Sequence, residues 1–194
     1  MRALRHRAPL AVALLASTVP AAHAATRTAQ QPVVYGNDDR VEVGDYGDDA
    51  VQALALHSTV ALVPRLGIAP SFPSFGMYEA SGRTAGEVLN LCPDEPFSDQ
   101  PVATFCSGVL IAPDLILTAA HCVTDASCGV TDVVFGYALD SSGDGMPIGS
   151  SQLYSCKQVI ARGDPTDPSV GDFTVFALDR PVASGLAPVT MRTS

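Results

Sequence analysis

Residues 106–122 read CSGVLIAPDLILTAAHC and contain two apolar runs separated by the short turn APD at 112–114. We predict strands over 104–111 and 115–118, because apolar residues fill both segments and turn residues bound them. The second strand leads into Thr-Ala-Ala-His-Cys, which places His121 among small side chains directly after a strand. Imidazole exchanges a proton near neutral pH, but a lone histidine is more often structural, so a catalytic role for His121 needs a second motif.

A carboxylate in a suitable position follows further along the chain. Residues 171–182 read GDFTVFALDRPV, in which Asp172 precedes an apolar segment that predicts a strand over 173–178. A half-buried carboxylate at the start of a strand can orient an imidazole by accepting a hydrogen bond from one ring nitrogen. Taken alone, an aspartate before an apolar strand is more often a solvated surface residue.

Together these motifs resemble those of trypsin-like serine proteases, in which Thr-Ala-Ala-His-Cys carries the catalytic histidine and an aspartate opens a strand that ends in Leu-Asp-Arg-Pro-Val. The resemblance implies that His121 is the general acid/base and that Asp172 orients its Nδ1. It also implies a disulfide between Cys106 and Cys122, and protein or peptide substrates. Residues 33–40, VVYGNDDR, resemble the start of bacterial glutamyl endopeptidases, a secreted branch of the same family.

Members of this family are built from two six-stranded β-barrels, and the histidine and aspartate come from the first. The resemblance therefore implies an all-β, chymotrypsin-like Greek-key barrel, the first of the two, with the second barrel absent from this chain. The 16 glycines and 15 prolines agree with an all-β fold rich in turns.

The third member of a Ser-His-Asp triad is missing from the sequence. The family's serine lies far downstream in Gly-Asp-Ser-Gly-Gly or Gly-Asn-Ser-Gly-Ser, and neither occurs here. Ser141 and Ser142 stand between the histidine and the aspartate, where the family has no nucleophile. We expect a secreted serine endopeptidase represented by its N-terminal barrel, truncated before the nucleophile, inactive alone and in need of a C-terminal barrel. The alternative is a non-catalytic secreted module that uses a single barrel to bind a partner.

Three segments are expected along the chain. Residues 1–24 have the basic, apolar and small-x-small parts of a signal peptide, so we expect secretion to the extracellular space or periplasm. Residues 25–57 form a prosegment or N-terminal extension, with a short helix over 48–56. Residues 58–194 form the barrel, with further strands over 58–63, 132–137 and 157–161 and a long proline-rich loop over 64–103.

The charge of the chain excludes one class of partner. Its 11 basic and 20 acidic residues give a net charge of −9, and removing residues 1–24 takes three arginines and no acidic residue, which leaves −12. We therefore expect no nucleic-acid partner. No segment after the signal approaches the length of a membrane span, so we expect no membrane partner.

Five cysteines in an exported chain indicate disulfides and leave one cysteine over. The pairing of Cys92, Cys128 and Cys156 stays open at this point. We expect no metal and no cofactor. A zinc site is disfavoured because no Cys-x-x-Cys pair occurs. Residues 140–151 have the spacing of a calcium loop, but Ser151 stands where the closing acidic ligand is needed.

Three further residues have side chains that could serve in a site, namely His57, Asp164 and Asp167. His57 precedes the first strand without a partner motif, and we interpret it as structural. Asp164 and Asp167 lie in a proline-containing turn ahead of Asp172, where acidic residues serve turn geometry.

Overall fold

The structure is a computed structural model that describes residues 38–72, 77–80, 83–92, 94–139, 147–167 and 169–192. The chain divides into the units 1–39 and 40–194, and the second carries the fold. The signal segment 1–24, the first part of the extension (25–37) and the predicted loop residues 140–146 lie outside the described residues.

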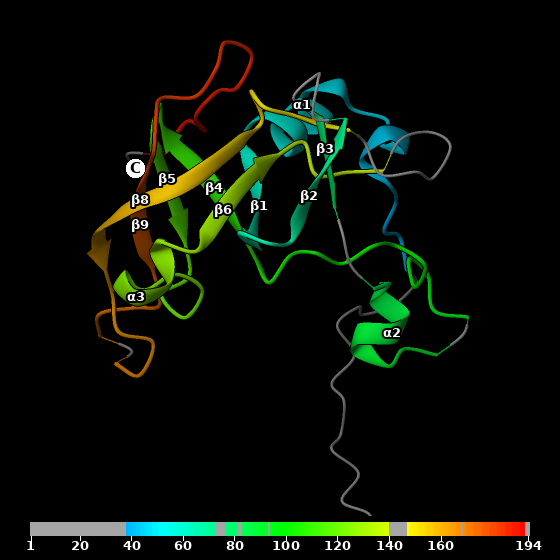
Figure 1. Ribbon diagram of the computed structural model, residues 1–194, viewed down its shortest axis with the longest axis horizontal. Coiled ribbons are helices and arrows are strands. Elements are labelled where there is room, and N and C mark those ends of the chain that lie inside the picture. The colour runs from blue at the N-terminus through cyan, green and yellow to red at the C-terminus, as the bar shows by residue number, and fades with distance from the viewer. Residues whose placement is uncertain are drawn as a thin grey trace, which may run out of the picture. The chain divides into compact units, whose positions relative to one another are not determined.

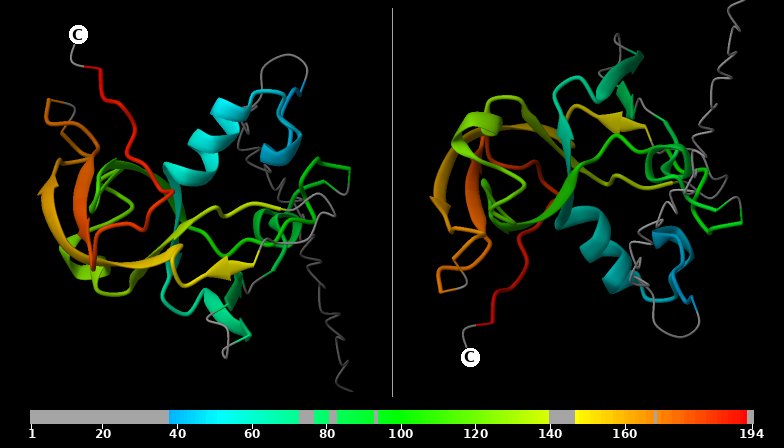
Figure 2. Two further views of the ribbon diagram at one scale, coloured as in Figure 1. Left: turned by 90° about the horizontal axis from the view of Figure 1, so that it is seen from above. Right: turned by 90° about the horizontal axis from the view of Figure 1, so that it is seen from below.

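Six antiparallel strands form a closed barrel in the order β1-β4-β5-β9-β8-β6, and β6 pairs back onto β1. Figure 2 shows the strands curving into a ring when the fold is seen from above or below. The predicted all-β barrel is thus confirmed. The strands are β1 (Thr59–Pro64), β4 (Cys106–Ala112), β5 (Leu115–Thr118), β6 (Thr131–Phe135), β8 (Leu153–Arg162) and β9 (Thr174–Leu178).

The prediction of a long loop over 64–103 is wrong in part. β2 (Ile68–Phe72) and β3 (Met77–Ala80) form a hairpin, and β7 (Ile148–Gly149) completes a three-stranded sheet in the order β2-β3-β7. Proline at position 70 is compatible with this sheet because β2 is an edge strand. Figure 1 shows this small sheet beside β1 and β6.

A short helix, α2 (Ala85–Leu89), also lies in that segment. Its first turn is closed by a capping box: the Thr84 side chain accepts a hydrogen bond from the Glu87 N–H, and the Glu87 side chain accepts one from the Thr84 N–H. Thr-x-x-Glu is a readable signature of a helix start, so the sequence held this signal.

The described residues also contain the helical segments η1 (Val43–Asp45), α1 (Asp49–His57) and α3 (Asp125–Cys128); α1 packs beside β1, α3 beside β8, and η1 beside α1. The predicted helix over 48–56 corresponds to α1. Asp48 is its N-cap and accepts hydrogen bonds from the N–H groups of Ala50 and Val51, which explains why the helix begins there.

Two clusters contain most of the buried apolar side chains of the described residues. The larger fills the barrel, and the smaller packs between the outer wall of the barrel and the three-stranded sheet. Because successive strand residues point to opposite faces, β6 serves both: Val133 and Phe135 belong to the first cluster and Val134 to the second. The barrel core comprises Val60, Leu62, Leu110, Ile116, Val123, Cys128, Val133, Phe135, Tyr154, Cys156, Phe176 and Leu178.

Tyr154 is the largest fully buried side chain of the barrel, and its polar end is satisfied. The ring packs edge-on against Phe135, with 5.6 Å between centroids. The hydroxyl donates to the carbonyl of Ser151 (2.8 Å) and accepts from the N–H of Ala183 (2.8 Å). This residue therefore ties β8 to the segment that follows β9. The strand predicted over 157–161 extends over Leu153–Arg162 in the structure. It begins earlier because Tyr154 and Cys156 are also strand residues, with their side chains in the core.

Replacing Tyr154 with phenylalanine should lower the free energy of unfolding by about 1–2 kcal/mol, because the N–H of Ala183 loses its acceptor. Urea unfolding followed by circular dichroism measures the change. Tyr46→Phe is the matched control, since that side chain is half exposed, and it should change stability by less than about 0.5 kcal/mol. Equal effects in the two variants would contradict this account.

Candidate active site

The pairing of β5 with β9 brings the two predicted site residues together. The strands are antiparallel, and Thr118, the last residue of β5, lies opposite Thr174, the first residue of β9. The chain therefore leaves β5 toward His121 at the same edge from which it enters β9 after Asp172. Two motifs far apart in sequence meet at one end of the barrel.

At that edge His121 and Asp172 make two contacts. The ring Nδ1 of His121 lies 2.7 Å from Oδ2 of Asp172, and the backbone N–H of His121 donates to Oδ1 at 3.2 Å. The carboxylate is thus held by both the ring and the main chain of one residue. The two side chains are 63% and 40% exposed, so Asp172 is more open to solvent than the half-buried position that the sequence predicted.

The surroundings lower the pKa of the Asp172 carboxyl below its ordinary value. Partial desolvation is the largest influence and raises the pKa, but it is outweighed by hydrogen bonds from the His121 ring and from the backbone N–H groups of His121 and Ala120, together with the charge of His121. All of these donors favour the ionised carboxylate. Asp172 is therefore an anion that accepts a hydrogen bond from Nδ1–H of His121.

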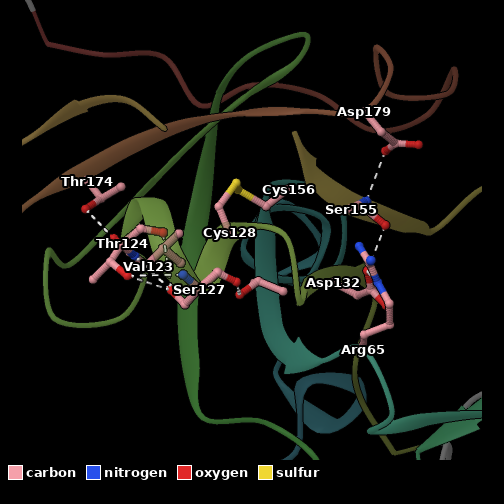
Figure 3. Close-up of a disulfide and its surroundings, with 11 residues drawn as sticks. Arg65, Val123, Thr124, Ser127, Cys128, Asp132, Ser155, Cys156, Thr174 and Asp179 are labelled. Atoms are coloured by element: carbon pink, nitrogen blue, oxygen red, sulfur yellow. Dashed lines mark hydrogen bonds and ion pairs between the residues drawn. A yellow bond between two sulfur atoms is a disulfide. The ribbon is translucent and has the colours of Figure 1, made fainter. Parts of the chain in front are cut away.

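Several bonds hold the loop that carries His121. Cys106, at the start of β4, forms a disulfide with Cys122, with 6.0 Å between the Cα atoms. Thr118 donates through its hydroxyl to the carbonyl of Ser107 (2.7 Å). On the other side of the loop, Thr174 donates to the carbonyl of Val123 (2.9 Å), a contact drawn in Figure 3. His121 thus lies between anchors on both sides.

A second disulfide joins Cys128 at the end of α3 to Cys156 in β8, as Figure 3 shows. In the chain-entropy model, closing loops of 16 and 28 residues stabilises the fold by about 3 and about 3.5 kcal/mol respectively. Cys92 is the free cysteine among the described residues and is exposed.

One cluster in the structure has the residue types of a metal site. Cys106, His121 and Cys122 bring their ligand atoms within 4.8 Å of one another. The two sulfurs are bonded to each other, so neither is the thiolate that a metal would require. The segment 140–151, which has the spacing of a calcium loop but lacks its closing acidic ligand, falls largely in residues 140–146, outside the described part of the chain.

The loop that delivers Asp172 is closed by two glycines. Gly163 lies so close to Gly171 that a Cβ atom at Gly163 would stand 2.0 Å from the Gly171 carbonyl oxygen. Gly171 itself has a φ of +89°, a conformation that side chains disfavour. The N–H of Gly163 donates to the carbonyl of Phe173 (2.7 Å). The two ends of the loop, Gly163 and Gly171, are therefore in contact, and Gly171 is the residue that precedes Asp172.

Inside this loop Asp164 and Asp167 are turn residues, as predicted. Asp164 accepts hydrogen bonds from the N–H and hydroxyl of Thr166, and Asp167 accepts the same pair from Ser169. These bonds lower the pKa of both carboxyls. His57 ends α1, and its carbonyl accepts from the N–H of Ala187 (3.2 Å).

Sequence reasoning missed two residues at this edge of the barrel, Arg162 and Gly163. The guanidinium of Arg162 contacts the main chain beside His121, and Gly163 contacts the Asp172 loop. The Gly-Asp-Pro turn that begins at Gly163 was a readable signal for a tight loop. No pattern in the sequence indicated the contact of Arg162.

Replacing Gly163 with alanine should destabilise the fold by about 1–3 kcal/mol, because the new methyl group meets main chain rather than a movable side chain. Thermal unfolding measures the loss. Gly129→Ala is the matched control: Gly129 has a φ of −62° and open space around it, so its change should stay within about 0.5 kcal/mol. A Gly163→Ala protein as stable as the control would contradict the close approach.

His121→Ala should raise the pKa of the Asp172 carboxyl, because the hydrogen bond from the ring and its charge are lost. The folded-state pKa of Asp172 lies below its unfolded value of about 4, so its ionisation stabilises the fold above that pH and ceases to do so as the pH falls through the folded-state pKa. A carbon-13 NMR titration of the aspartate carboxyls measures the Asp172 midpoint in the wild-type chain and in His121→Ala. His57→Ala should leave the Asp172 midpoint unchanged. An unaltered midpoint in His121→Ala would contradict the contact.

Comparison with known proteins places the chain in a family. The family model for trypsin matches residues 97–193, half of the 194 residues. A solved structure of the VesB protease of Vibrio cholerae is similar at 23% sequence identity and a TM-score of 0.39. The match covers 72% of this chain and 32% of the VesB chain, so this chain spans about a third of the length of that protein. On the match to the family model, the chain belongs to the trypsin-like serine protease family.

Proposed function

We propose that this barrel supplies the general base and the orienting carboxylate of a secreted serine endopeptidase. His121 is the base and Asp172 its partner. The observation that carries the proposal is the pair of contacts that Asp172 makes with His121, 2.7 Å to the ring Nδ1 and 3.2 Å to the backbone nitrogen. The substrates are proteins or peptides, in keeping with the family.

The geometry suits proton transfer at Nε2. In the neutral tautomer whose Nδ1–H donates a hydrogen bond to Asp172, Nε2 is an acceptor, and the His121 side chain is 63% exposed. A serine hydroxyl hydrogen-bonded to Nε2 would lose its proton to the ring as it attacks the substrate carbonyl carbon. The Asp172 anion would then stabilise the imidazolium, which later protonates the leaving amine.

The nucleophile has to come from elsewhere in the working enzyme. Among the described residues, no serine hydroxyl is hydrogen-bonded to His121, and the 194-residue sequence contains no Gly-Asp/Asn-Ser-Gly segment. We propose that a second barrel provides the serine and the N–H groups that bind the oxyanion. In such enzymes, this stabilisation of the oxyanion lowers the activation free energy by roughly 3–4 kcal/mol. The 194 residues alone would then lack hydrolytic activity.

Export is part of the proposal. It rests on the signal-like residues 1–24 and is supported by two disulfides, which form and persist in oxidising compartments. Within the described residues, no helix has the length and apolar character needed to cross a bilayer.

The test uses the longest secreted product that the gene encodes, assayed for peptide hydrolysis and for labelling by a fluorophosphonate, a reagent for activated serines. His121→Ala should abolish labelling, and Asp172→Asn should lower kcat by about 10⁴, the figure known for the Ser-His-Asp template of this same family. Asp164→Asn is the matched control, because Asp164 lies in the same loop and contacts Thr166 instead. It should retain activity.

The outcomes test the role of His121 and distinguish a serine endopeptidase from a single-barrel binding module. Labelling that survives His121→Ala would contradict the role of His121 as the base. A secreted product that is folded and never labelled would exclude the catalytic proposal for it and favour the alternative, a single-barrel module that binds a partner.

A further inference from the structure

We infer that Arg162 is a positioning residue for His121. Its guanidinium makes a forked contact with one carbonyl: Nε and Nη2 donate to the oxygen of Ala120 at 3.1 and 3.0 Å. Ala120 directly precedes His121, and its side chain is fully buried. This inference rests on the proposed function, because it concerns how the base is held.

The contact acts on His121 through a single peptide unit. The carbonyl of Ala120 and the N–H of His121 belong to the same planar group. Arg162 holds the carbonyl end of that plane, and Oδ1 of Asp172 accepts from its N–H end at 3.2 Å. Holding both ends fixes the rotation of the plane and therefore the direction in which the His121 side chain leaves the main chain. Hydrogen bonds in such a row also polarise one another, which strengthens the donation to Asp172.

The strand register places Arg162 where it can do this. Arg162 ends β8 and lies opposite Thr174 in β9, which in turn lies opposite Thr118 in β5. The three residues form a row across neighbouring strands, at the edge where His121 and Asp172 meet. The next residue, Gly163, contacts the Asp172 loop. Two adjacent residues at the end of β8 thus support both halves of the pair.

The forked geometry distinguishes arginine from lysine at this position. A guanidinium presents Nε–H and Nη2–H along fixed, nearly parallel directions, so it defines where the carbonyl oxygen must lie. An ammonium group keeps the charge but offers no such fork. Arg162→Lys therefore tests geometry at constant charge, and Arg162→Met keeps an unbranched stem without any donor.

Arg180 provides a matched control. Its guanidinium also donates to main-chain carbonyls, those of Ser150 and Leu153, and packs over the ring of Tyr154 at 4.2 Å. Arg180→Met therefore removes arginine–carbonyl hydrogen bonds of the same kind from another part of the barrel. Any effect that Arg162→Met has on His121 beyond that of Arg180→Met reports positioning and not loss of stability.

The experiment is nitrogen-15 NMR on the oxidised full chain with labelled histidine, and the signals of His121 are assigned by their absence in His121→Ala. In the wild-type chain the Nδ1 proton of His121 should appear at low field and exchange slowly. In Arg162→Met its protection against exchange should fall by about tenfold or more, the factor expected for losing a hydrogen bond to a charged group. The protection of this proton in Arg162→Lys should lie between the wild-type value and that of Arg162→Met. Arg180→Met should leave its protection unchanged.

Wild-type exchange of the Nδ1 proton in Arg162→Met would overturn the inference and leave the proposed function intact. If that variant does not fold, Arg162→Lys decides alone, and wild-type exchange in it would overturn the inference. Absence of an Nδ1 proton bound to Asp172 in the folded wild-type chain would overturn both the inference and the proposed function.

Discussion

The site depends on the register in which β5 pairs with β9. Thr118 lies opposite Thr174, and this pairing sets how far His121 and Asp172 stand from each other. The core determines the register, because a shift by one residue would turn Phe176 and Leu178 from the barrel interior to its outside. Burial of two apolar side chains in β9 therefore fixes the position of a carboxylate that itself remains in solvent.

The two loops at this edge are held by independent means. The histidine loop is bonded covalently through Cys106–Cys122, whereas the aspartate loop closes because Gly163 and Gly171 come into direct contact. Thr174 connects the two by donating to Val123. Two side chains as exposed as those of His121 and Asp172 cannot rely on their own burial for order. The positions of these two side chains are instead set by the main chain of the two loops that carry them.

Much of this arrangement could be predicted from the sequence, since it rests on local patterns. The strand over 115–118 has the predicted bounds, and the helix over 48–56 shifts by one residue. The segment 64–103 is predicted as a loop from its prolines and its few alternating apolar positions, whereas the structure has a hairpin there and a helix that begins at the capping box of Thr84. The role of Arg162 could not be predicted, because its contact with Ala120 depends on the pairing of β8 with β9 and not on any local pattern.

A crystal structure of the oxidised chain would test the central claim most directly, namely that this barrel by itself holds the imidazole against the carboxylate. The account predicts Thr118 opposite Thr174, an intact Cys106–Cys122 bond, and Nδ1 of His121 within hydrogen-bond distance of Asp172. A β9 strand shifted in register, or an imidazole turned away from Asp172 in a barrel with this pairing, would contradict it.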